Sequence, residues 1–100
     1  MVRIASEAAR KIGRRIAAER AAIGATQQDL SYHSKVDLPS LSQYEHGRAM
    51  PNVGTIVRLA QTLGIDPGVL ISGLTYADFP QHREPPQTLE GPRWQRSSTA

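Results

Sequence analysis

The chain contains no cysteine among its 100 residues. Disulfide bonds and cysteine-ligated zinc are therefore excluded, and the composition fits a reducing compartment. No stretch approaches the roughly 18 apolar residues that a membrane span needs. The basic N-terminus is not followed by the apolar run of a signal peptide. From these absences we expect a soluble, cytoplasmic protein without a membrane partner.

Patterns typical of catalysis or of metal binding are also missing. No nucleophile with its base, no pair of carboxylates and no glycine-rich phosphate loop is found. The three histidines, His33, His46 and His82, do not have the spacing of metal ligands, and surface positions are expected for them. The sequence thus predicts no enzyme, no cofactor and no metal site.

The positive charge of the chain is concentrated near its start. The net charge is +3, but the first 25 residues hold six basic against two acidic residues, which gives +4. The six are Arg3, Arg10, Lys11, Arg14, Arg15 and Arg20. Such a cluster is either a solvated helix face or a flank that faces DNA phosphates. Charge alone does not separate these two interpretations.

The spacing of apolar residues predicts five helices and no strand. The expected ranges are about 6–23, 27–34, 38–45, 53–63 and a short helix after residue 66. The first helix is expected to carry an apolar face of Ala5, Ala8, Ala9, Ile12, Ile16 and Ile23. Start signals precede the helices at Ser6, Thr26, Asp37, Asn52 and Asp66. Stop signals follow at Gly24, Gly47 and Gly64. Five helices in about 70 residues indicate an all-α domain.

The two short helices between Thr26 and Glu45 are the most informative segment. Leu30, Val36, Leu41 and Tyr44 are spaced so that the two helices pack against each other at a steep angle. This is the pattern of a DNA-binding helix-turn-helix, whose second helix enters the major groove.

The chain resembles the Cro and phage-repressor family of helix-turn-helix regulators, often called the XRE family. The resemblance covers about residues 12–74, with landmarks IGRRIAAERAAIGATQQDL at 12–30, EHGRAMP at 45–51 and IVRLAQTLGID at 56–66. It implies a five-helix, lambda-repressor-like DNA-binding domain. We place this domain at residues 1–75, with the motif at 26–45.

The last part of the chain differs in composition. Residues 80–100 hold four prolines, and their only large apolar residues are Leu89 and Trp94, so they cannot form a core. Residues 76–100 are therefore predicted to be a flexible tail. Trp94, between Arg93 and Arg96, is either a docking spot for a protein partner or an incidental aromatic residue.

The resemblance implies base contacts by the start of the second motif helix. The positions are Leu38, Pro39 and Gln43, of which Gln43 pairs well with adenine. Leucine and proline depart from the polar residues of many relatives and offer only apolar contacts, for example with a thymine methyl group. Either the direct code is short and partly based on DNA shape, or the helix has drifted to another use.

The resemblance also implies contacts with the DNA backbone at Gln27, Lys35, Ser40, Gly47 and Arg48. Gln27 starts a helix, where an anion is favoured; otherwise it is an exposed first-turn residue. Lys35 replaces a glycine that relatives use for a left-handed backbone, at a cost of about 1 kcal/mol, unless the turn has another conformation. Arg48 is either a phosphate contact or a solvated cation.

Two further pairs of residues are expected to have roles other than contact with DNA. Arg20 and Glu45 match a family ion pair that orients the second motif helix. Val69 and Ile71 of the fifth helix are expected to face outward in a homodimer interface, while Leu70 and Leu74 of that helix face the core.

The sequence therefore predicts a sequence-specific DNA-binding transcriptional regulator, most simply a dimeric repressor of double-stranded DNA. Compact forms that fit are a phage-type repressor, a restriction-modification controller protein and an antitoxin that represses its own operon. In the antitoxin form the tail would fold onto a toxin. A different class of function is a protein-interaction module that has lost DNA binding.

Overall fold

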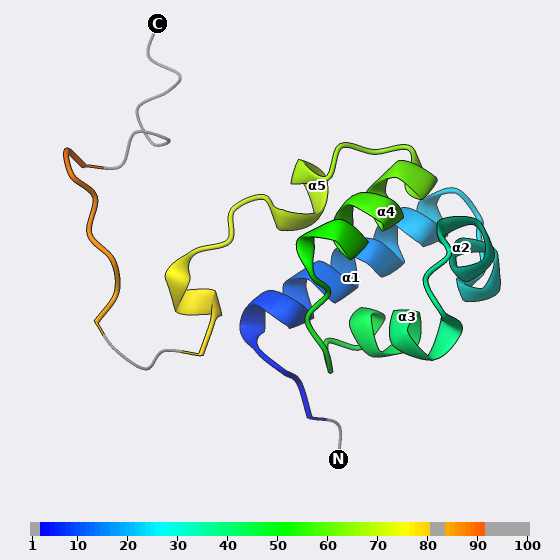
Figure 1. Ribbon diagram of the computed structural model, residues 1–100, viewed down its shortest axis with the longest axis horizontal. Helices are drawn as coiled ribbons and strands as arrows, with labels where there is room; N and C mark the ends of the chain where they lie inside the picture. The colour runs from blue at the N-terminus through cyan, green and yellow to red at the C-terminus, as the bar shows by residue number, and fades with distance from the viewer. Residues whose placement is uncertain (1–2, 81–83, 92–100) are drawn as a thin grey trace, which may run out of the picture.

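The computed structural model describes residues 3–80 and 84–91, and these contain helices and no strand. The elements are α1 (Glu7–Ala22), α2 (Gln27–Ser34), α3 (Leu38–Glu45), α4 (Val53–Leu63), α5 (Gly68–Ile71) and a 3-10 helix η1 (Tyr76–Asp78). Figure 1 shows α1 running through the middle of the domain, with α3 on one side of it and α5 on the other. α2 packs on both α3 and α4. The predicted all-α, five-helix, lambda-repressor-like fold is confirmed.

Side-chain caps explain where the first four helices begin. Ser6, Asp37 and Asn52 each accept a hydrogen bond from the backbone N–H three residues later, at 3.0, 2.9 and 2.8 Å. Thr26 and Asp29 form a reciprocal capping box. These bonds satisfy amides that the first helical turn leaves without a partner. The predicted bounds of α2, α3 and α4 are confirmed to the residue.

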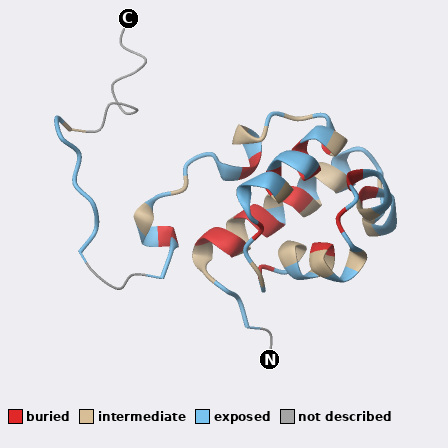
Figure 2. Cartoon of the chain, in the orientation of Figure 1, coloured by how far each residue is buried: buried red, intermediate tan, exposed pale blue. Residues whose placement is uncertain are grey.

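The apolar faces of the helices meet in one core, which Figure 2 shows in red along the inner sides of α1 and α4. Leu30, Val36 and Leu41 are buried, and Tyr44 packs against the same cluster. These are the residues expected to hold α2 against α3. Leu59 lies fully buried on α4 and extends the core away from the helix-turn-helix.

Three expectations for α1 and α5 were wrong. Ile23 is the C-cap of α1 and is 61% exposed, and Ala5 is exposed and precedes the helix. Leu74 does not belong to α5, because the helix ends at Ile71 and Gly73 turns the chain with φ +76°. Leu74 nevertheless packs against the core. In the sequence, the helical spacing of apolar residues continues beyond the ends of α1 and α5. The backbone turns away there to join the neighbouring segment, so the spacing overestimated the length of both helices.

The turn between α2 and α3 has the left-handed backbone that the family resemblance implied. Lys35 has φ 65° and ψ 25°, and it is the one non-glycine residue with positive φ among those described. Its Nζ lies 4.8 Å from the centroid of the Tyr32 ring. A cation–π contact of this kind at an exposed site contributes about 0.5–1 kcal/mol, which offsets part of the backbone strain.

The chain continues in contact with the domain beyond residue 75, where we expected the tail to begin. η1 carries the buried Asp78, whose carboxylate accepts hydrogen bonds from Thr75 N–H and Lys11 Nζ, both at 2.9 Å. These partners hold the pKa of Asp78 below its usual value. Trp94 and its arginine neighbours lie outside the described residues. No helix in the described part of the chain has the length and apolar character of a membrane span.

α1 and α3 approach each other closely at Gly13. A Cβ atom at this position would lie 2.1 Å from the carbonyl oxygen of Tyr44 and 2.9 Å from that of Glu45. Both atoms belong to the backbone of α3, so neither moves without moving the helix. The absence of a side chain at Gly13 therefore sets the distance between α1 and α3.

We predict that Gly13→Ala destabilises the domain by about 2–3 kcal/mol, because the added methyl group must push α3 away from α1. The free energy of unfolding, measured with urea, tests this. Gly54→Ala is the matched control in α4, where the new Cβ would meet only the Asn52 side chain at 3.5 Å. That variant should be neutral or more stable by up to about 1 kcal/mol. Equal stability of the two variants would show that the helices separate at little cost.

Candidate nucleic-acid interface

α3 presents one exposed stripe to solvent. Pro39 and Gln43 are exposed and lie four residues apart, and His46 follows three residues later, so all three share one side of the helix. Leu41 faces the core on the opposite side. Leu38 is half-buried and lies away from the centre of the stripe. Of the three predicted base-reading residues, Gln43 and Pro39 are thus the best placed to meet a groove.

A buried carboxylate joins the three helices around this stripe. Glu45, at the end of α3, has a side chain that is only 4% exposed. Arg20 of α1 donates to it twice, from Nε and Nη2, each at 2.7 Å. Gln27 of α2 donates a third hydrogen bond from Nε2 at 2.9 Å. The predicted ion pair is therefore present, and Glu45 raises the pKa of Arg20 by accepting its hydrogen bonds.

Gln27 has a second role that the sequence did not indicate. One N–H of its side-chain amide is held by Glu45, which leaves the other N–H for an outside acceptor. The capping box also occupies the backbone amides of Thr26 and Asp29. A phosphate at this helix start would therefore meet the amides of Gln27 and Gln28 and one side-chain N–H, fewer donors than an uncapped helix offers.

The loop after α3 is held rigidly against the start of α1. The Gly47 carbonyl accepts a hydrogen bond from Ala5 N–H at 2.7 Å. Gly47 has φ +70°, and a Cβ there would lie 2.9 Å from the Cα of Arg10. The Arg48 N–H returns to the Gln43 carbonyl at 2.9 Å, while its side chain is exposed. Buried Gly47 thus contributes its backbone conformation, and Arg48 is left free to reach outward.

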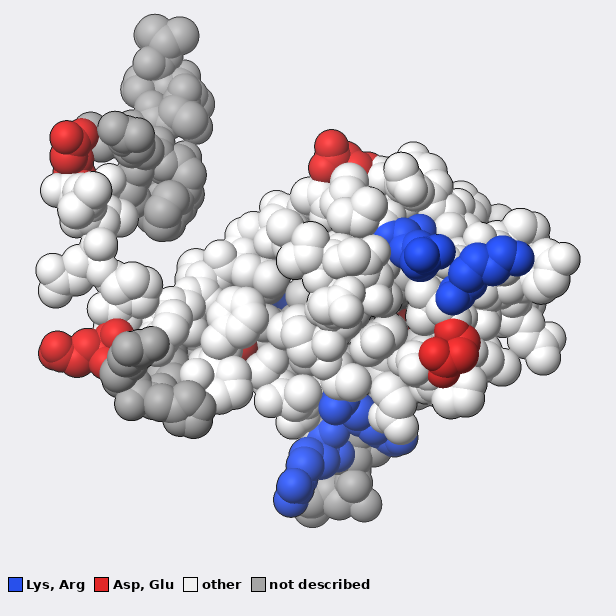
Figure 3. Space-filling model, in the orientation of Figure 1, with Lys and Arg blue, Asp and Glu red and all other residues white. Residues whose placement is uncertain are grey.

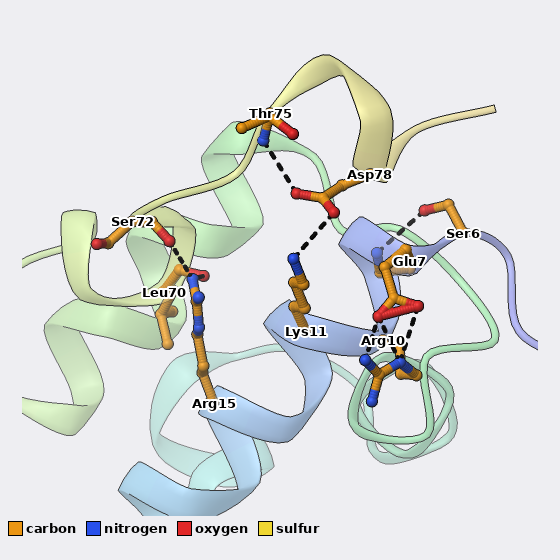
Figure 4. A network of polar contacts seen from close by, with 10 residues as sticks. Ser6, Glu7, Arg10, Lys11, Arg15, Leu70, Ser72, Thr75 and Asp78 are labelled. Atoms are coloured by element: carbon orange, nitrogen blue, oxygen red, sulfur yellow. Dashed lines mark hydrogen bonds and ion pairs between the residues drawn. The ribbon is translucent and has the colours of Figure 1, made fainter. Parts of the chain in front are cut away.

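Most basic side chains of the first 25 residues bind partners within the protein. Arg10 pairs with Glu7, Arg20 with Glu45, and Lys11 with Asp78 at 2.9 Å. Arg15 donates to the carbonyls of Leu70 and Ser72 at 3.1 and 2.7 Å. Figure 4 shows Lys11 and Arg15 directed at the segment that follows α5. This basic cluster is therefore neither a solvated face nor chiefly a phosphate flank, because Arg10 is paired within α1 and three other members, Lys11, Arg15 and Arg20, connect α1 to other parts of the fold.

Other basic side chains are exposed near α3. Figure 3 shows basic side chains in two groups, one beside the N-terminal segment and one towards α2. Lys35 and Arg48 are exposed at the two ends of α3, and no carboxylate among the described residues forms an ion pair with either. The Asp37 carboxylate lies at the start of α3. Hydrogen bonding from Ser40 keeps the pKa of Asp37 below its ordinary value. Ser40 itself is half-buried.

The residues expected at a dimer interface are on the surface. Val69 is 41% and Ile71 45% exposed, while Leu70 between them is fully buried. Val53 and Val57, one turn apart on α4, are also exposed apolar residues. The burial of Leu70, the partial burial of Leu74 and the exposure of Val69 and Ile71 thus agree with the inward and outward assignment.

Sequence reasoning missed two residues of this region. Gly13 was not singled out, and a glycine in a long helix gives no sign of which backbone it will meet. His46 was expected at the surface, in the loop that resembles the family's backbone-contacting loop, but not on the exposed stripe of α3, where it lies. Its spacing from Pro39 and Gln43 was available in the sequence and would have placed it there.

Comparisons with known proteins agree with this geometry. Residues 11–71 match the model of a family described as helix-turn-helix domain. The restriction-modification controller protein C.AhdI from Aeromonas hydrophila superposes with a TM-score of 0.61 and 31% identity, over 62% of this chain and 94% of that one. The P22 c2 repressor bound to a synthetic operator gives 0.58 and 29%, over 62% and 94%.

A third solved structure shares the fold alone. The clp gene regulator ClgR from C. glutamicum superposes with a TM-score of 0.61 at 24% identity, over 63% of this chain and 82% of that one. No curated protein sequence matches the chain.

We predict that Glu45→Ala destabilises the domain by about 2 kcal/mol. Breaking a buried pair costs roughly 3–5 kcal/mol, and the value is reduced here because Arg20 keeps some contact with solvent. Thermal and urea unfolding measure the effect. Glu7→Ala, which removes the partner of exposed Arg10, is the control and should lower stability much less. An unchanged melting temperature for Glu45→Ala would mean that Arg20 is solvated without its partner.

Proposed function

This chain belongs to the helix-turn-helix domain family, with relatives of the Cro and phage-repressor (XRE) type, and we propose that it is a dimeric transcriptional repressor that places α3 in the major groove of DNA. The observation that carries the proposal is the exposed stripe of α3, held in place by the buried Arg20–Glu45 pair. A recognition helix must be rigid to read base edges, because hydrogen-bond geometry tolerates little displacement. The P22 relative, whose structure contains operator DNA, supports the same use of the fold.

Base recognition is assigned to exposed Gln43 and Pro39 and to half-buried Leu38. Gln43 offers both a donor and an acceptor, which suits the N6 and N7 atoms of adenine. Pro39 makes an apolar contact, for which the thymine methyl group is the natural partner. Half-buried Leu38 contributes at the edge of the contact. One polar reader for each chain makes the direct code short, so DNA shape supplies part of the specificity.

Backbone contacts are assigned to Gln27, Lys35, Ser40, Gly47 and Arg48. Lys35 and Arg48 lie in the loops before and after α3, so they fit phosphates on the two sides of one groove. Gly47 supports Arg48 by fixing the loop to α1. Phosphate contacts of this kind set the position of the helix and do not read the sequence.

Dimerisation through Val69 and Ile71 would pair two recognition helices. A single α3 contacts too few bases for high specificity, and two copies related by a twofold axis read half-sites about 34 Å apart. The exposure of both side chains beside buried Leu70 supports this surface.

The second candidate function is a protein-interaction module that has lost DNA binding. Its support is that four of the six cations in the first 25 residues bind within the fold, and that apolar Pro39 is exposed on α3. The antitoxin form, with a toxin bound to the tail, rests on residues 76–100, of which the structure describes 76–80 and 84–91. The antitoxin form also represses an operon, so only the interaction module predicts that free DNA is not bound.

We expect the protein to select related duplexes from a random pool, with two half-sites about one DNA turn apart. On the selected duplex, Gln43→Ala should relax one base preference, whereas Arg48→Ala should weaken all sequences and reduce the salt slope by about 1. Fluorescence anisotropy measures both, between about 50 and 200 mM salt. If no duplex binds at the lower salt, the interaction module replaces the repressor.

We expect the paired substitutions Val69→Asp and Ile71→Asp to give a monomer, because two charges would be buried between the subunits. Sedimentation equilibrium gives the mass, with and without the selected duplex. Ile23→Asp, which changes an exposed apolar residue at the far end of α1, is the control and should leave the mass unchanged. A parent protein that stays monomeric on DNA would rule out the dimer.

A further inference from the structure

Residues 72–79, which we call the strap, follow α5 and include η1. The match to the helix-turn-helix family ends at residue 71, so the strap is an addition to the part of the chain that the family model describes. Two basic side chains of α1, Lys11 and Arg15, bind it (Figure 4). The proposed DNA contacts all lie elsewhere in the chain, so DNA binding does not account for this attachment.

The attachment places the strap directly beside α5. Arg15 donates to the Leu70 and Ser72 carbonyls, at 3.1 and 2.7 Å, where α5 ends. Lys11 donates to the buried Asp78 carboxylate of η1 at 2.9 Å. Side chains four residues apart on a helix are neighbours on one face, with Cβ atoms about 5–6 Å apart. The end of α5 and η1 therefore lie next to each other along one face of α1.

Apolar side chains are exposed on both of these neighbouring elements. Val69 and Ile71 are exposed on α5, and Phe79, directly after η1, is 39% exposed. The backbone of Phe79 is fixed, because its N–H donates to the Tyr76 carbonyl at 3.1 Å. A side chain on a fixed backbone loses less conformational entropy when it meets a partner. The strap thus presents a preorganised apolar contact beside the surface of α5.

α5 alone is too small to hold two subunits together. It has four residues and offers two exposed apolar side chains, whereas a stable interface takes roughly 20–30 residues from each subunit. The strap extends this surface without a break, and a phenylalanine at an interface buries about 150–250 Å². α3 lies on the other side of α1 from α5 (Figure 1). A second copy seated on α5 and the strap would therefore leave the exposed stripe of α3 accessible.

We propose that the strap is the second part of the subunit interface, where Phe79 contacts a second copy of this chain beside Val69 and Ile71. The inference rests on the proposed dimer and names a surface of it that lies outside the family match. Lys11 and Arg15 are positioning residues in this interface, because they hold the strap and the end of α5 on α1. The basic residues of α1 would then serve assembly of the dimer.

The first test is the dissociation constant of the dimer, measured by sedimentation equilibrium on the full chain. Phe79→Asp should weaken the dimer by about tenfold or more, because an unpaired charge would be buried between the subunits. Phe79→Leu, which keeps an apolar side chain, should retain most of the affinity. Val53→Asp is the matched control, since Val53 is exposed and lies at the end of α4 that is far from α5. It should keep the dissociation constant of the parent.

A second measurement leaves Phe79 in place and does not depend on the stability of its variants. The chain has no cysteine, so a single thiol can be introduced and followed. Ala77→Cys places a thiol at an exposed position of η1. Its rate of reaction with a maleimide should fall several-fold when the protein concentration is raised from well below to well above the dissociation constant. The thiol of Val53→Cys should react at one rate throughout.

Lys11→Met tests the positioning role. Removing the ammonium group frees the Asp78 carboxylate from α1, so the strap should loosen and the dimer should weaken. Combined with Phe79→Asp, the substitution should weaken the dimer little further, because both changes remove the same contact. Lys11→Arg, which keeps a donor, should restore part of the affinity. Additive effects of Lys11→Met and Phe79→Asp would overturn the positioning role.

The outcomes separate this inference from the dimer on which it depends. A parent protein that stays monomeric at every concentration, with and without the selected duplex, rules out the dimer and this inference together. A parent dimer that is broken by Val69→Asp with Ile71→Asp, but is unaffected by Phe79→Asp, overturns the inference alone. Equal reactivity of the Ala77→Cys thiol in monomer and dimer has the same meaning. The strap would then lie outside the interface, and α5 would dimerise without it.

Discussion

The buried carboxylate of Glu45 is the interaction on which the arrangement of the helix-turn-helix depends. A carboxylate with 4% exposure is stable only if its oxygens are bound, and here three hydrogen bonds come from Arg20 of α1 and Gln27 of α2. One side chain thereby connects three helices. Gly13 completes the constraint, since its lack of a side chain lets α1 come close enough for Arg20 to reach α3. The stripe on α3 therefore has one orientation relative to the core.

The distribution of charge follows from how the fold uses its cations. Lys11 and Arg15 bind the segment after α5, so the chain from Ser72 to Asp78 is fastened to α1 rather than left in solvent. Cations engaged in this way have little freedom to bind phosphate. What remains for DNA is a small set at the ends of α3, chiefly Lys35 and Arg48. The proposed function would therefore depend on a few phosphate contacts and on dimerisation, and less on a broad positive surface.

Base recognition is likewise assigned to few residues. Pro39 and Gln43 share the centre of the exposed side of α3, and Leu38 lies towards the core. One polar reader with one apolar neighbour distinguishes few base pairs. In the proposed dimer, twofold symmetry would double the contacts, and the deformability of the DNA between the half-sites would add discrimination without contact.

The sequence by itself determined the order of the helices, the caps of the first four and the family. Local signals such as Thr26 with Asp29, or Asn52 before an apolar stripe, act within a few residues, so they are visible without the fold. Positions on one helix are likewise predictable, and His46 could have been placed beside Gln43 by spacing alone. The contact partners of these residues could not be predicted in this way, because each contact joins two segments that are distant in the chain. Only the tertiary structure decided that Gly13 faces the backbone of Tyr44 and that Gln27 binds Glu45. It also decided that most of the basic residues of α1 bind partners within the protein.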